Sequence, residues 1–384
     1  MTTNKNHNSP NVPNLRFPEF QGEWEESTIG EEFDLYSGNT PSRLNKEHFN
    51  GAINWISSGE LKEHYIADTK EKISDEAAKS LKMLPIGTFV IAIYGLEADG
   101  VRGTGSITKS ESTISQACMA FTSKGKVQNE FLYSWYKKHG NVIGIRYAQG
   151  TKQQNLSYDI IEKFKIAYPT FQEQEKLNKF IALLDKRIAT QNKIIEDLKK
   201  LKSAISERLF KSVKGSIVLL SDICDIVKGK QINGENLSER GRYYVMNGGT
   251  EPSGYYDDYN VEANTISISE GGNSCGYVQF NTFPFWSGGH CYSIQNVTGN
   301  VDNLYLYHYL KSNEDNIMKL RIGSGLPNIQ KKDLAMFKII VPTLEQQMTI
   351  STFLSSIERK AEIERRIQNA IQKQKLYLLQ QMFI

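Results

Sequence analysis

The side chains that could do chemistry in this chain are few and widely scattered. Glu60 and Lys62 have the E-x-K spacing of half a nuclease metal site, and Arg102 opens a glycine-rich Arg-Gly-Thr-Gly-Ser run. Both patterns arise by chance in a charged chain, so a surface charge pair and a β-turn are the competing interpretations. The sequence has no G-x-x-x-x-G-K-[ST] phosphate loop, no H-E-x-x-H and no Asn/Asp-Pro-Pro-aromatic segment. The residues therefore favour a chain with no catalytic site of its own.

Cysteine and histidine positions give no metal-ligand pattern. Cys118, Cys224, Cys275 and Cys291 are scattered without a C-x-x-C pair. This spacing indicates neither a disulfide framework nor a zinc site, and it fits a reducing compartment. His290 adjoins Cys291, but adjacent ligands without a paired set elsewhere are more typical of a core cysteine. We expect no metal site.

Length and composition indicate a folded protein of two or three domains. The chain has 384 residues, 39% of them hydrophobic and 10% aromatic, with a net charge of +3 and a pI near 8.4. This small positive charge permits nucleic-acid binding without indicating it. No apolar run approaches the ~20 residues of a membrane span, and the first residues lack a secretion signal. We therefore expect a cytoplasmic location.

A long internal repeat indicates how the chain is organised. Shifted by 173 residues, segment 150–210 aligns without a gap on 323–383, with 13 identities in 61 positions. The best block pairs Phe-Lys-Ile-Ala-Tyr-Pro-Thr, ending at Thr170, with Phe-Lys-Ile-Ile-Val-Pro-Thr, ending at Thr343. Each block reads as a strand stopped by proline, followed by a helix start with a capping hydroxyl before acidic residues. The order is therefore domain, helix, domain, helix.

Both repeated helices carry apolar residues at alternating steps of four and three, which is the pattern of a coiled-coil seam. Polar residues interrupt the seam at Gln191, Lys202, Glu364, Gln368 and Lys375, which favours one particular partner and register over generic self-association. The predicted seam residues are Leu177, Ile181, Leu184, Ile188, Ile195, Leu198, Ile205, Leu209, Ile350, Leu354, Ile357, Ile371, Leu378 and Met382.

A pair of such helices could act as a spacer. If the two repeats are related by a pseudo-twofold axis and their helices pair antiparallel, the two domains lie at opposite ends of the pair. A helix over about 172–210 is ~58 Å long at ~1.5 Å per residue, which exceeds one DNA turn of ~34 Å. Because the domain interiors, about 40–150 and 230–320, differ in sequence, any DNA site read this way should be asymmetric and split by an unread spacer.

The loops that interrupt strand-like segments carry polar, basic and aromatic side chains. Segments 89–94 and 264–269 read as strands, and each is followed by glycines. Loops on β scaffolds commonly carry recognition, and such side chains can reach base edges, phosphates or extruded bases. Packing in a small β core is the alternative for any single aromatic residue. The candidate DNA-contacting residues are Ser37, Gly38, Asn39, Thr40, Ser42, Arg43, Tyr94, Arg102, Gln116, Lys228, Lys230, Asn247, Tyr255, Tyr259, Trp286 and His290.

The order of several short motifs resembles one known family. These motifs are Leu15-Arg-Phe-Pro-Glu-Phe-Gln-Gly-Glu-Trp24, Ser37-Gly-Asn-Thr-Pro-Ser42, Ile53-Asn-Trp-Ile-Ser-Ser-Gly-Glu60 and Ser115-Gln-Ala-Cys118, together with Pro169-Thr and Pro342-Thr before the long helices. Each string is weak alone, but their order and the 173-residue repeat resemble the specificity (S) subunit of type I restriction-modification systems. The second domain departs from the pattern with Lys-Gly-Lys-Gln at 228–231, where the first has Gly-Asn-Thr-Pro at 38–41.

The resemblance implies an α+β fold with two target-recognition domains, each a β-rich α/β globule. Two long helices separate them as an antiparallel coiled coil with pseudo-twofold (cyclic) symmetry. The expected segments are a disordered tail (1–14), recognition domain 1 (15–170), the central spacer helix (171–213), recognition domain 2 (214–343) and the C-terminal spacer helix (344–384).

The resemblance also implies a function and a set of partners. Such a chain reads one half of a bipartite double-stranded DNA site with each domain and docks two methyltransferase subunits through its helices. Restriction subunits join the complex, and S-adenosylmethionine, ATP and Mg belong to the partners, with none in this chain. Two rival hypotheses are a coiled-coil adaptor that does not bind DNA and a self-contained nuclease or methyltransferase. The missing motifs oppose the second rival, and two helices placed after dissimilar domains fit the first poorly.

Overall fold

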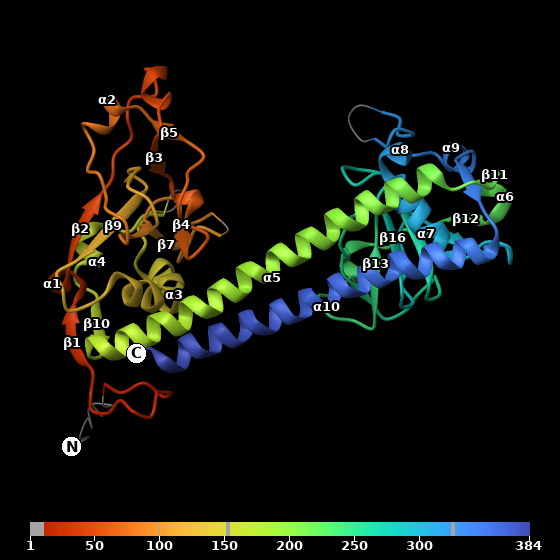
Figure 1. Ribbon diagram of the computed structural model, residues 1–384. Helices are drawn as coiled ribbons and strands as arrows, with labels where there is room; N and C mark the ends of the chain where they lie inside the picture. The colour runs from red at the N-terminus through yellow and green to blue at the C-terminus, as the bar shows by residue number, and fades with distance from the viewer. Residues whose placement is uncertain (1–10, 99, 151–153, 324–326) are drawn as a thin grey trace. The chain divides into compact units, whose positions relative to one another are not determined.

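The computed structural model describes residues 11–98, 100–150, 154–323 and 327–384, which fold into two compact units (Figure 1). Unit 1 takes residues 1–191 and 367–384, and unit 2 takes residues 192–366. Two long helices contribute to both units, α5 (Phe171–Ser212) and α10 (Leu344–Met382). Each unit therefore combines one β-rich region with a stretch of both helices, which confirms the α+β fold.

A five-stranded sheet of order β2-β9-β6-β7-β4 organises unit 1. Its pairs are antiparallel except for the edge strand β4, which runs parallel to β7. A three-stranded sheet of order β5-β3-β8 and the ribbon β1-β10 complete the unit. The strands are β1 (Glu25–Thr28), β2 (Phe33–Ser37), β3 (Ile53–Ile56), β4 (Tyr65–Ile66), β5 (Lys72–Ile73), β6 (Phe89–Ala92), β7 (Gly105–Thr108), β8 (Ser112–Ile114), β9 (Cys118–Ser123) and β10 (Lys165–Tyr168).

The helix α3 packs on this sheet and forms its core. Phe131 and Tyr133 of α3 are buried against Phe89 and Phe121 of the sheet, and burial of each such ring contributes roughly 1.5–3 kcal/mol. The shorter helices of unit 1 lie at turns between strands. The helices are α1 (Ile29–Glu32), η1 (Lys46–Phe49), η2 (Ser58–Glu60), α2 (Asp75–Ala78), α3 (Asn129–Tyr147) and α4 (Tyr158–Ile161).

Unit 2 repeats this plan with fewer strands. Its main sheet has the order β12-β18-β15-β16, beside a sheet of order β14-β13-β17 and the ribbon β11-β19. The strands are β11 (Ser216–Leu219), β12 (Asp225–Lys228), β13 (Tyr243–Met246), β14 (Tyr255–Tyr256), β15 (Thr265–Ser269), β16 (Val278–Asn281), β17 (Trp286–Ser287), β18 (Cys291–Gln295) and β19 (Lys338–Val341). The helices are α6 (Leu220–Ile223), η3 (Gly234–Asn236), α7 (Asn303–Ser312), α8 (Glu314–Met318) and α9 (Lys331–Ala335).

A repeated glutamine attaches each long helix to its own unit. In unit 1 the Gln174 side chain accepts a hydrogen bond from the Gln128 backbone, 2.9 Å away, and donates to the Pro169 carbonyl. In unit 2 the Gln347 side chain accepts from the Asp302 backbone at 2.8 Å and donates to the Pro342 carbonyl. Both glutamines are fully buried. Since an unpaired buried amide is costly, these matching contacts fix both helix starts.

All of the predicted seam residues are buried or half-buried. In unit 1, Leu177 and Ile181 of α5 share a core with Met382 of α10. In unit 2, Leu209 packs in the same cluster as Leu354. The seam residues near the ends of the two helices therefore pack into the cores of the two units.

One local expectation needs correction. It concerns the N-terminal tail. Of the tail predicted over 1–14, residues 1–10 lie outside the described residues. Asn11 already accepts a hydrogen bond from the Trp24 backbone, and Pro13 is buried. Packing therefore begins before residue 15.

Candidate nucleic-acid interface

The loops that follow β2 and β12 are held by the same contacts in both units. The Gly38 backbone donates to the Cys118 carbonyl at 3.3 Å, and the Gly229 backbone donates to the Cys291 carbonyl at 2.8 Å. A Cβ at Gly38 would lie 2.2 Å from a backbone oxygen, and a Cβ at Gly229 would do the same. Only glycine fits this close approach, so both loops leave their sheets at one fixed point.

A tryptophan indole then holds the next residue of each loop. Trp55 donates through Nε1 to the Asn39 carbonyl at 3.1 Å, and Trp286 donates through Nε1 to the Lys230 carbonyl at 2.9 Å. Ser37 of unit 1 is therefore equivalent to Lys228 of unit 2, and Asn39 is equivalent to Lys230. The backbone is therefore alike in the two loops, while the side chains differ in charge.

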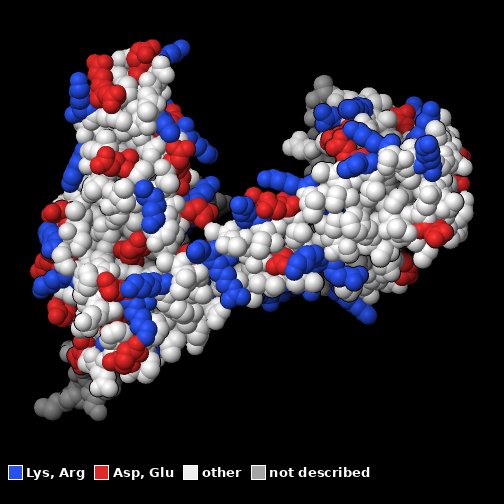
Figure 2. Space-filling view, viewed as in Figure 1, with Lys and Arg blue, Asp and Glu red and all other residues white. Residues whose placement is uncertain are grey.

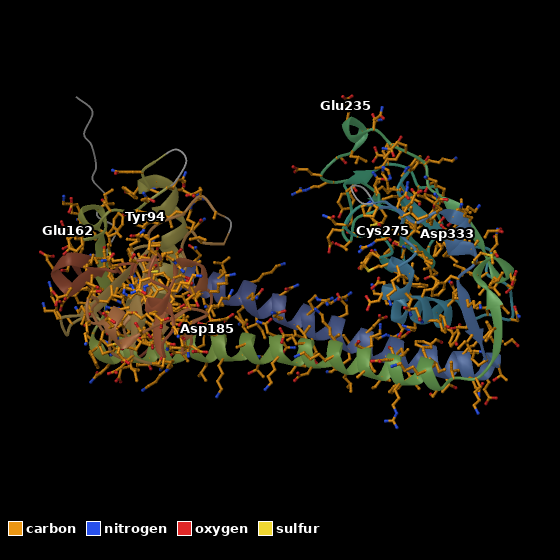
Figure 3. All side chains as sticks on the ribbon, turned by 90° about the horizontal axis from the view of Figure 1, so that it is seen from above. Tyr94, Glu162, Asp185, Glu235, Cys275 and Asp333 are labelled. Atoms are coloured by element: carbon orange, nitrogen blue, oxygen red, sulfur yellow. The ribbon has the colours of Figure 1, made fainter. Side chains whose placement is uncertain are left out.

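In unit 1 the structure gathers several candidate residues at one end of the main sheet. Ser37, Asn39 and Gln116 are exposed there, beside Gly38. Tyr94 follows β6 at the same end and is 36% exposed. Figure 3 shows Tyr94 away from α5, the helix that carries Asp185.

Other candidates in unit 1 lie in settings that restrict them. Arg43 is paired with Glu71 at 2.5 Å and lies over the Phe49 ring. Arg102 donates to Gln154 and lies in the Val101–Thr104 turn, so the β-turn interpretation of the glycine-rich run is confirmed. Thr40 is half-buried, and Ser42 is exposed beside Arg43.

In unit 2 the corresponding sheet end carries charge. The Lys228 ammonium lies 2.7 Å from Glu270 Oε1, and the Tyr292 hydroxyl donates to the same oxygen at 3.1 Å. His290 Nδ1 lies 3.9 Å from Glu270 Oε2. Glu270 is 7% exposed, whereas the side chains of Lys228 and His290 are 53% and 64% exposed. A buried carboxylate thus holds two outward-facing basic side chains.

The remaining candidates of unit 2 adjoin or flank this cluster. Asn247 accepts a hydrogen bond from the His290 backbone at 3.1 Å, which joins it to the cluster. Trp286 is half-buried under Lys230. Tyr255 and Tyr259, each 37% exposed, lie on and beside β14. The Tyr259 hydroxyl donates to Glu262.

Two polar groups that matter in the structure did not stand out in the sequence. Glu270 directly follows the strand 265–269, and a charged residue in a Ser-Glu-Gly-Gly turn was the available signal. His64 lies in a charged stretch with no motif around it. Neither could be singled out, because each draws its environment from residues far away in the chain.

The residues of the weak nuclease and metal patterns make structural contacts. Glu60 is occupied, since its carboxylate accepts hydrogen bonds from the Ser57 and Lys70 backbones. Cys275 and Cys291 are buried, and their thiols contact backbone carbonyls. Across the described ranges, no group of three or more His, Cys, Asp or Glu side chains is placed to hold a metal ion.

Two of the predicted polar interruptions of the helix seam, Lys202 and Lys375, form ion pairs across the helices. Asp185 of α5 pairs with Lys375 of α10 in unit 1, and Lys202 of α5 pairs with Glu358 of α10 in unit 2. The 173-residue shift converts Asp185 to Glu358 and Lys202 to Lys375, so each pair is the image of the other. Equivalent positions of α5 and α10 therefore exchange roles between the two units.

Asp185 also anchors a buried histidine in unit 1. His64 Nδ1 lies 2.9 Å from Asp185 Oδ2, His64 Nε2 lies 2.8 Å from Glu130 Oε2, and the imidazole stacks 4.0 Å from the Tyr133 ring. Burial opposes the charged imidazolium, but hydrogen bonds and attraction from Asp185 and Glu130 outweigh it and raise the pKa of His64. In unit 2, burial lowers the pKa of His308 to about 4, so that imidazole is neutral.

A family model for the type I restriction modification DNA specificity domain matches residues 21–200 and 215–373. The chain belongs to this family. The two matches cover most of the sequence and follow the internal repeat, which agrees with the shared frame of the two units. The order of the short sequence motifs predicts the same family.

Type I specificity subunits of other organisms are similar to this chain over all or part of their length. The type I restriction enzyme MjaVIII specificity subunit of Methanocaldococcus jannaschii is 23% identical over 422 residues, 97% of this chain and 94% of the relative. The EcoR124I/EcoR124II specificity subunit of Escherichia coli is 30% identical over 190 residues, 48% of this chain and 45% of the relative. Two mycoplasma relatives, from M. pneumoniae and M. genitalium, are matched over 38% of their length.

A solved structure shows the same fold. The crystal structure of a type I restriction-modification S subunit from M. genitalium matches with a TM-score of 0.67 and 18% identity, over 97% of this chain and 99% of that chain. None of the described helices is both long and apolar enough to cross a membrane. Figure 2 shows Lys/Arg and Asp/Glu side chains interspersed over the visible face of each unit.

Proposed function

We propose that this specificity-family chain reads a split, asymmetric DNA site, with one half read by each unit. The proposal rests on one observation. In both units a glycine and a tryptophan indole hold the loop at one end of the main sheet, but the side chains of the two loops differ in charge. A frame kept in both units indicates the same task, and a different set of side chains indicates a different target. Loops fixed on a rigid sheet are where recognition residues are commonly found.

The two sheet ends suggest different contacts with DNA. Ser37, Asn39 and Gln116 of unit 1 offer neutral donors and acceptors that suit base edges. Lys228 of unit 2 offers positive charge that suits phosphates or guanine edges, and His290 beside it offers ring nitrogens for hydrogen bonds. The two half-sites should therefore differ both in sequence and in the salt dependence of their binding.

The long helices are the proposed docking surface for two methyltransferase subunits. Both helices expose apolar side chains outside the seam, among them Leu183 (64%), Leu201 (50%), Ile363 (46%) and Leu376 (56%). Exposed apolar residues of this size on paired helices are typical of a protein interface. S-adenosylmethionine, ATP and Mg would be bound by the methyltransferase and restriction partners, and the catalytic steps would take place there.

Genome-wide methylation is the direct test of DNA reading. The chain would be expressed with its neighbouring methyltransferase subunit in a host that lacks native modification, and each protein would be omitted in turn. A split, asymmetric adenine-methylated motif that requires both proteins is the expected result. A stable complex that leaves the genome unmethylated would contradict the proposal and favour an adaptor.

An insertion tests whether the helices set the distance between the half-sites. Four residues added to α5 after Ile195, with four added at the facing position of α10, should lengthen the unread spacer while both half-sites stay the same. Methylation motifs of the variant and the original chain provide the readout. An unchanged spacer would show that the helices are not the ruler.

Docking is tested by changing an exposed apolar residue of α5. Leu201→Ser should leave the chain folded, because this side chain lies outside the seam, and should weaken assembly with the methyltransferase. The neighbouring, exposed Lys200→Ser is the matched control. Equal assembly of both variants, measured by size-exclusion chromatography, would move the docking site elsewhere.

A further inference from the structure

In unit 1 a short strand closes the open edge of the main sheet. The segment leading into β4 runs along β7, where the Ile107 backbone donates to the His64 carbonyl and the Lys109 backbone donates to the Ile66 carbonyl, both at 2.8 Å. The Ser106 hydroxyl donates to the Glu63 carbonyl at 2.6 Å. Leu61 is fully buried beneath this segment. The edge of β7 is therefore satisfied by the chain itself.

The same segment inserts a basic side chain against the helix pair. The His64 imidazole reaches Asp185 on α5 and stacks on Tyr133 of α3. Asp185 is 16% exposed as a result, with His64 on one side and Lys375 on the other. The added strand and a buried imidazole together fill the space between sheet and helices in unit 1.

Unit 2 has the same walls, but its described residues form no equivalent strand. Its main sheet ends at β16. Strand register makes Phe280 of unit 2 equivalent to Ile107 of unit 1. Phe280 pairs with Ile266 of β15, and Ile107 pairs with Phe89, the residue at the equivalent position of β6. Like Ile107, Phe280 turns its backbone N–H away from the neighbouring strand. Among the described residues this N–H has no hydrogen-bond partner.

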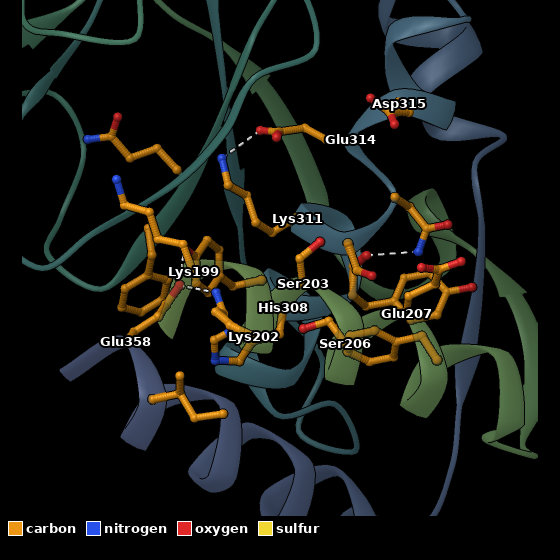
Figure 4. A pocket seen from close by; sticks show the side chains of 18 of the residues that line it. Lys199, Lys202, Ser203, Ser206, Glu207, His308, Lys311, Glu314, Asp315 and Glu358 are labelled. Atoms are coloured by element: carbon orange, nitrogen blue, oxygen red, sulfur yellow. Dashed lines mark hydrogen bonds and ion pairs between the residues drawn. The ribbon is translucent and has the colours of Figure 1, made fainter. Parts of the chain in front are cut away.

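A groove of about 1280 Å³ lies at this edge, entirely within unit 2. The groove occupies the place that the β4 segment fills in unit 1. Phe280, Tyr307 and Glu358 line the groove. Their equivalents in unit 1, Ile107, Tyr133 and Asp185, contact the β4 segment. Figure 4 shows Glu358 with Lys202 at one wall and Lys311 with Glu314 at another.

The groove contains a carboxylate, that of Glu358, which a strand added at this edge would contact. Glu358 accepts a hydrogen bond from the Tyr307 hydroxyl at 3.0 Å and pairs with Lys202. Its side chain is still 37% exposed, against 16% for Asp185, because no imidazole covers it. At the other end of β16, Glu314 and Lys311 cap the outward N–H and carbonyl of Val278. Edge pairing is therefore available at Phe280 and beyond.

We infer that this groove is a docking site for an extended peptide segment of a partner protein, which adds a strand parallel to β16 and places a histidine on Glu358. The internal template defines the occupant: in unit 1, β4 and His64 fill the matching space with a parallel strand and an imidazole paired with Asp185. Main-chain hydrogen bonds to Phe280 provide affinity, and the contact with Glu358 and Tyr307 provides specificity. The inference is independent of DNA reading.

The test uses the full chain and a labelled peptide copied from residues 60–68, Glu-Leu-Lys-Glu-His-Tyr-Ile-Ala-Asp. Fluorescence anisotropy without DNA should show saturable binding. Glu358→Gln should weaken binding about tenfold, because a charge-assisted hydrogen bond is lost. Phe280→Pro should weaken it at least as much, because proline removes the donor and is tolerated on edge strands. Glu345→Gln, the same charge change on α10 outside the groove, should have no effect.

Two further measurements keep the inference open to refutation if a variant fails to fold. Replacing the peptide histidine by glutamine should weaken binding to the original chain and have little effect with Glu358→Gln. In the unmodified chain, peptide should slow hydrogen exchange at the Phe280 amide. Absence of peptide binding, equal binding by the groove variants, or occupation of the groove by a DNA duplex in place of the peptide would overturn the inference.

Discussion

Units 1 and 2 share a frame but differ in what lies between the main sheet and the long helices. In unit 1 the acid on α5, Asp185, is covered by His64 and an added strand. In unit 2 the equivalent acid on α10, Glu358, faces an open groove. One ion pair is thus part of a core and the other is part of a surface. Equivalent sequence positions need not have equivalent energetic roles.

The opposite ends of the two sheets differ in the same manner. Backbone contacts hold both loops in place, yet Ser37 occupies in unit 1 the position that Lys228 occupies in unit 2. A second pair of equivalent positions, just after β6 and β15, holds the apolar Ile93 in unit 1 and the buried acid Glu270 in unit 2. The frame constrains the backbone and leaves the charge of the loop free to vary.

The largest expected contrast concerns the two acids of the helix pair. Asp185→Ala should destabilise the chain by about 3–5 kcal/mol, since it leaves the Lys375 ammonium without its partner and His64 with Glu130 alone. Glu358→Ala should cost only about 1 kcal/mol, because its pair is partly exposed. Urea unfolding of both variants measures the difference. Equal losses would mean that the two ion pairs have equivalent roles.

The two buried histidines should give opposite pH dependences. The pKa of His64 is raised, so its contribution is fully present below about pH 6.5 and is lost as pH rises through the raised value. The pKa of His308 falls to about 4, so its neutral form stabilises above about pH 6.5, and on the order of 3 kcal/mol is lost by pH 4.

Histidine variants separate these two contributions. Urea midpoints from pH 4 to pH 9 should show that His64→Gln removes the alkaline loss and His308→Gln removes the acidic one. The groups that face His64 are Glu130, Asp185 and, through Asp185, Lys375. An alkaline loss that persists in His64→Gln would assign the titration to another group.

A smaller effect is expected at the sheet ends. Lys228→Ser, which installs the residue of unit 1, should weaken DNA binding by the assembled complex about tenfold and change only one half of the methylated motif. Glu270→Gln should act in the same direction, since it releases the Lys228 ammonium. The exposed Lys214→Ser in the linker is the matched control for charge. A motif changed in both halves would contradict separate reading.

Much of the architecture followed from the sequence because its signals are local or repeated. The 173-residue repeat, the four-and-three spacing and the proline-threonine helix starts predicted two units and two long helices. Thr343 accepts a hydrogen bond from the Gln346 backbone, as expected of a cap. The polar seam positions Lys202 and Lys375 were expected to set a register, and both form ion pairs across the helices.

The candidate site was less predictable from the sequence than the fold, because its contacts join segments that are distant in the chain. The glycine-centred loop of unit 1 was found from sequence, but the indole that holds it comes from β3, and nothing in the loop predicts Trp55 as its partner. The DNA-contacting roles of the candidate residues stay predictions.

By itself, then, the sequence determined the family, the repeat and the helical seam, since periodicity and motif order are written along the chain. Only the tertiary structure decided which polar residues became buried. His64 and Glu270 acquire their roles from residues brought to them by sheet pairing and helix packing. The absence of a β4 equivalent at β16 was also invisible in the sequence, because an open edge is a property of the neighbouring strands and not of the strand itself.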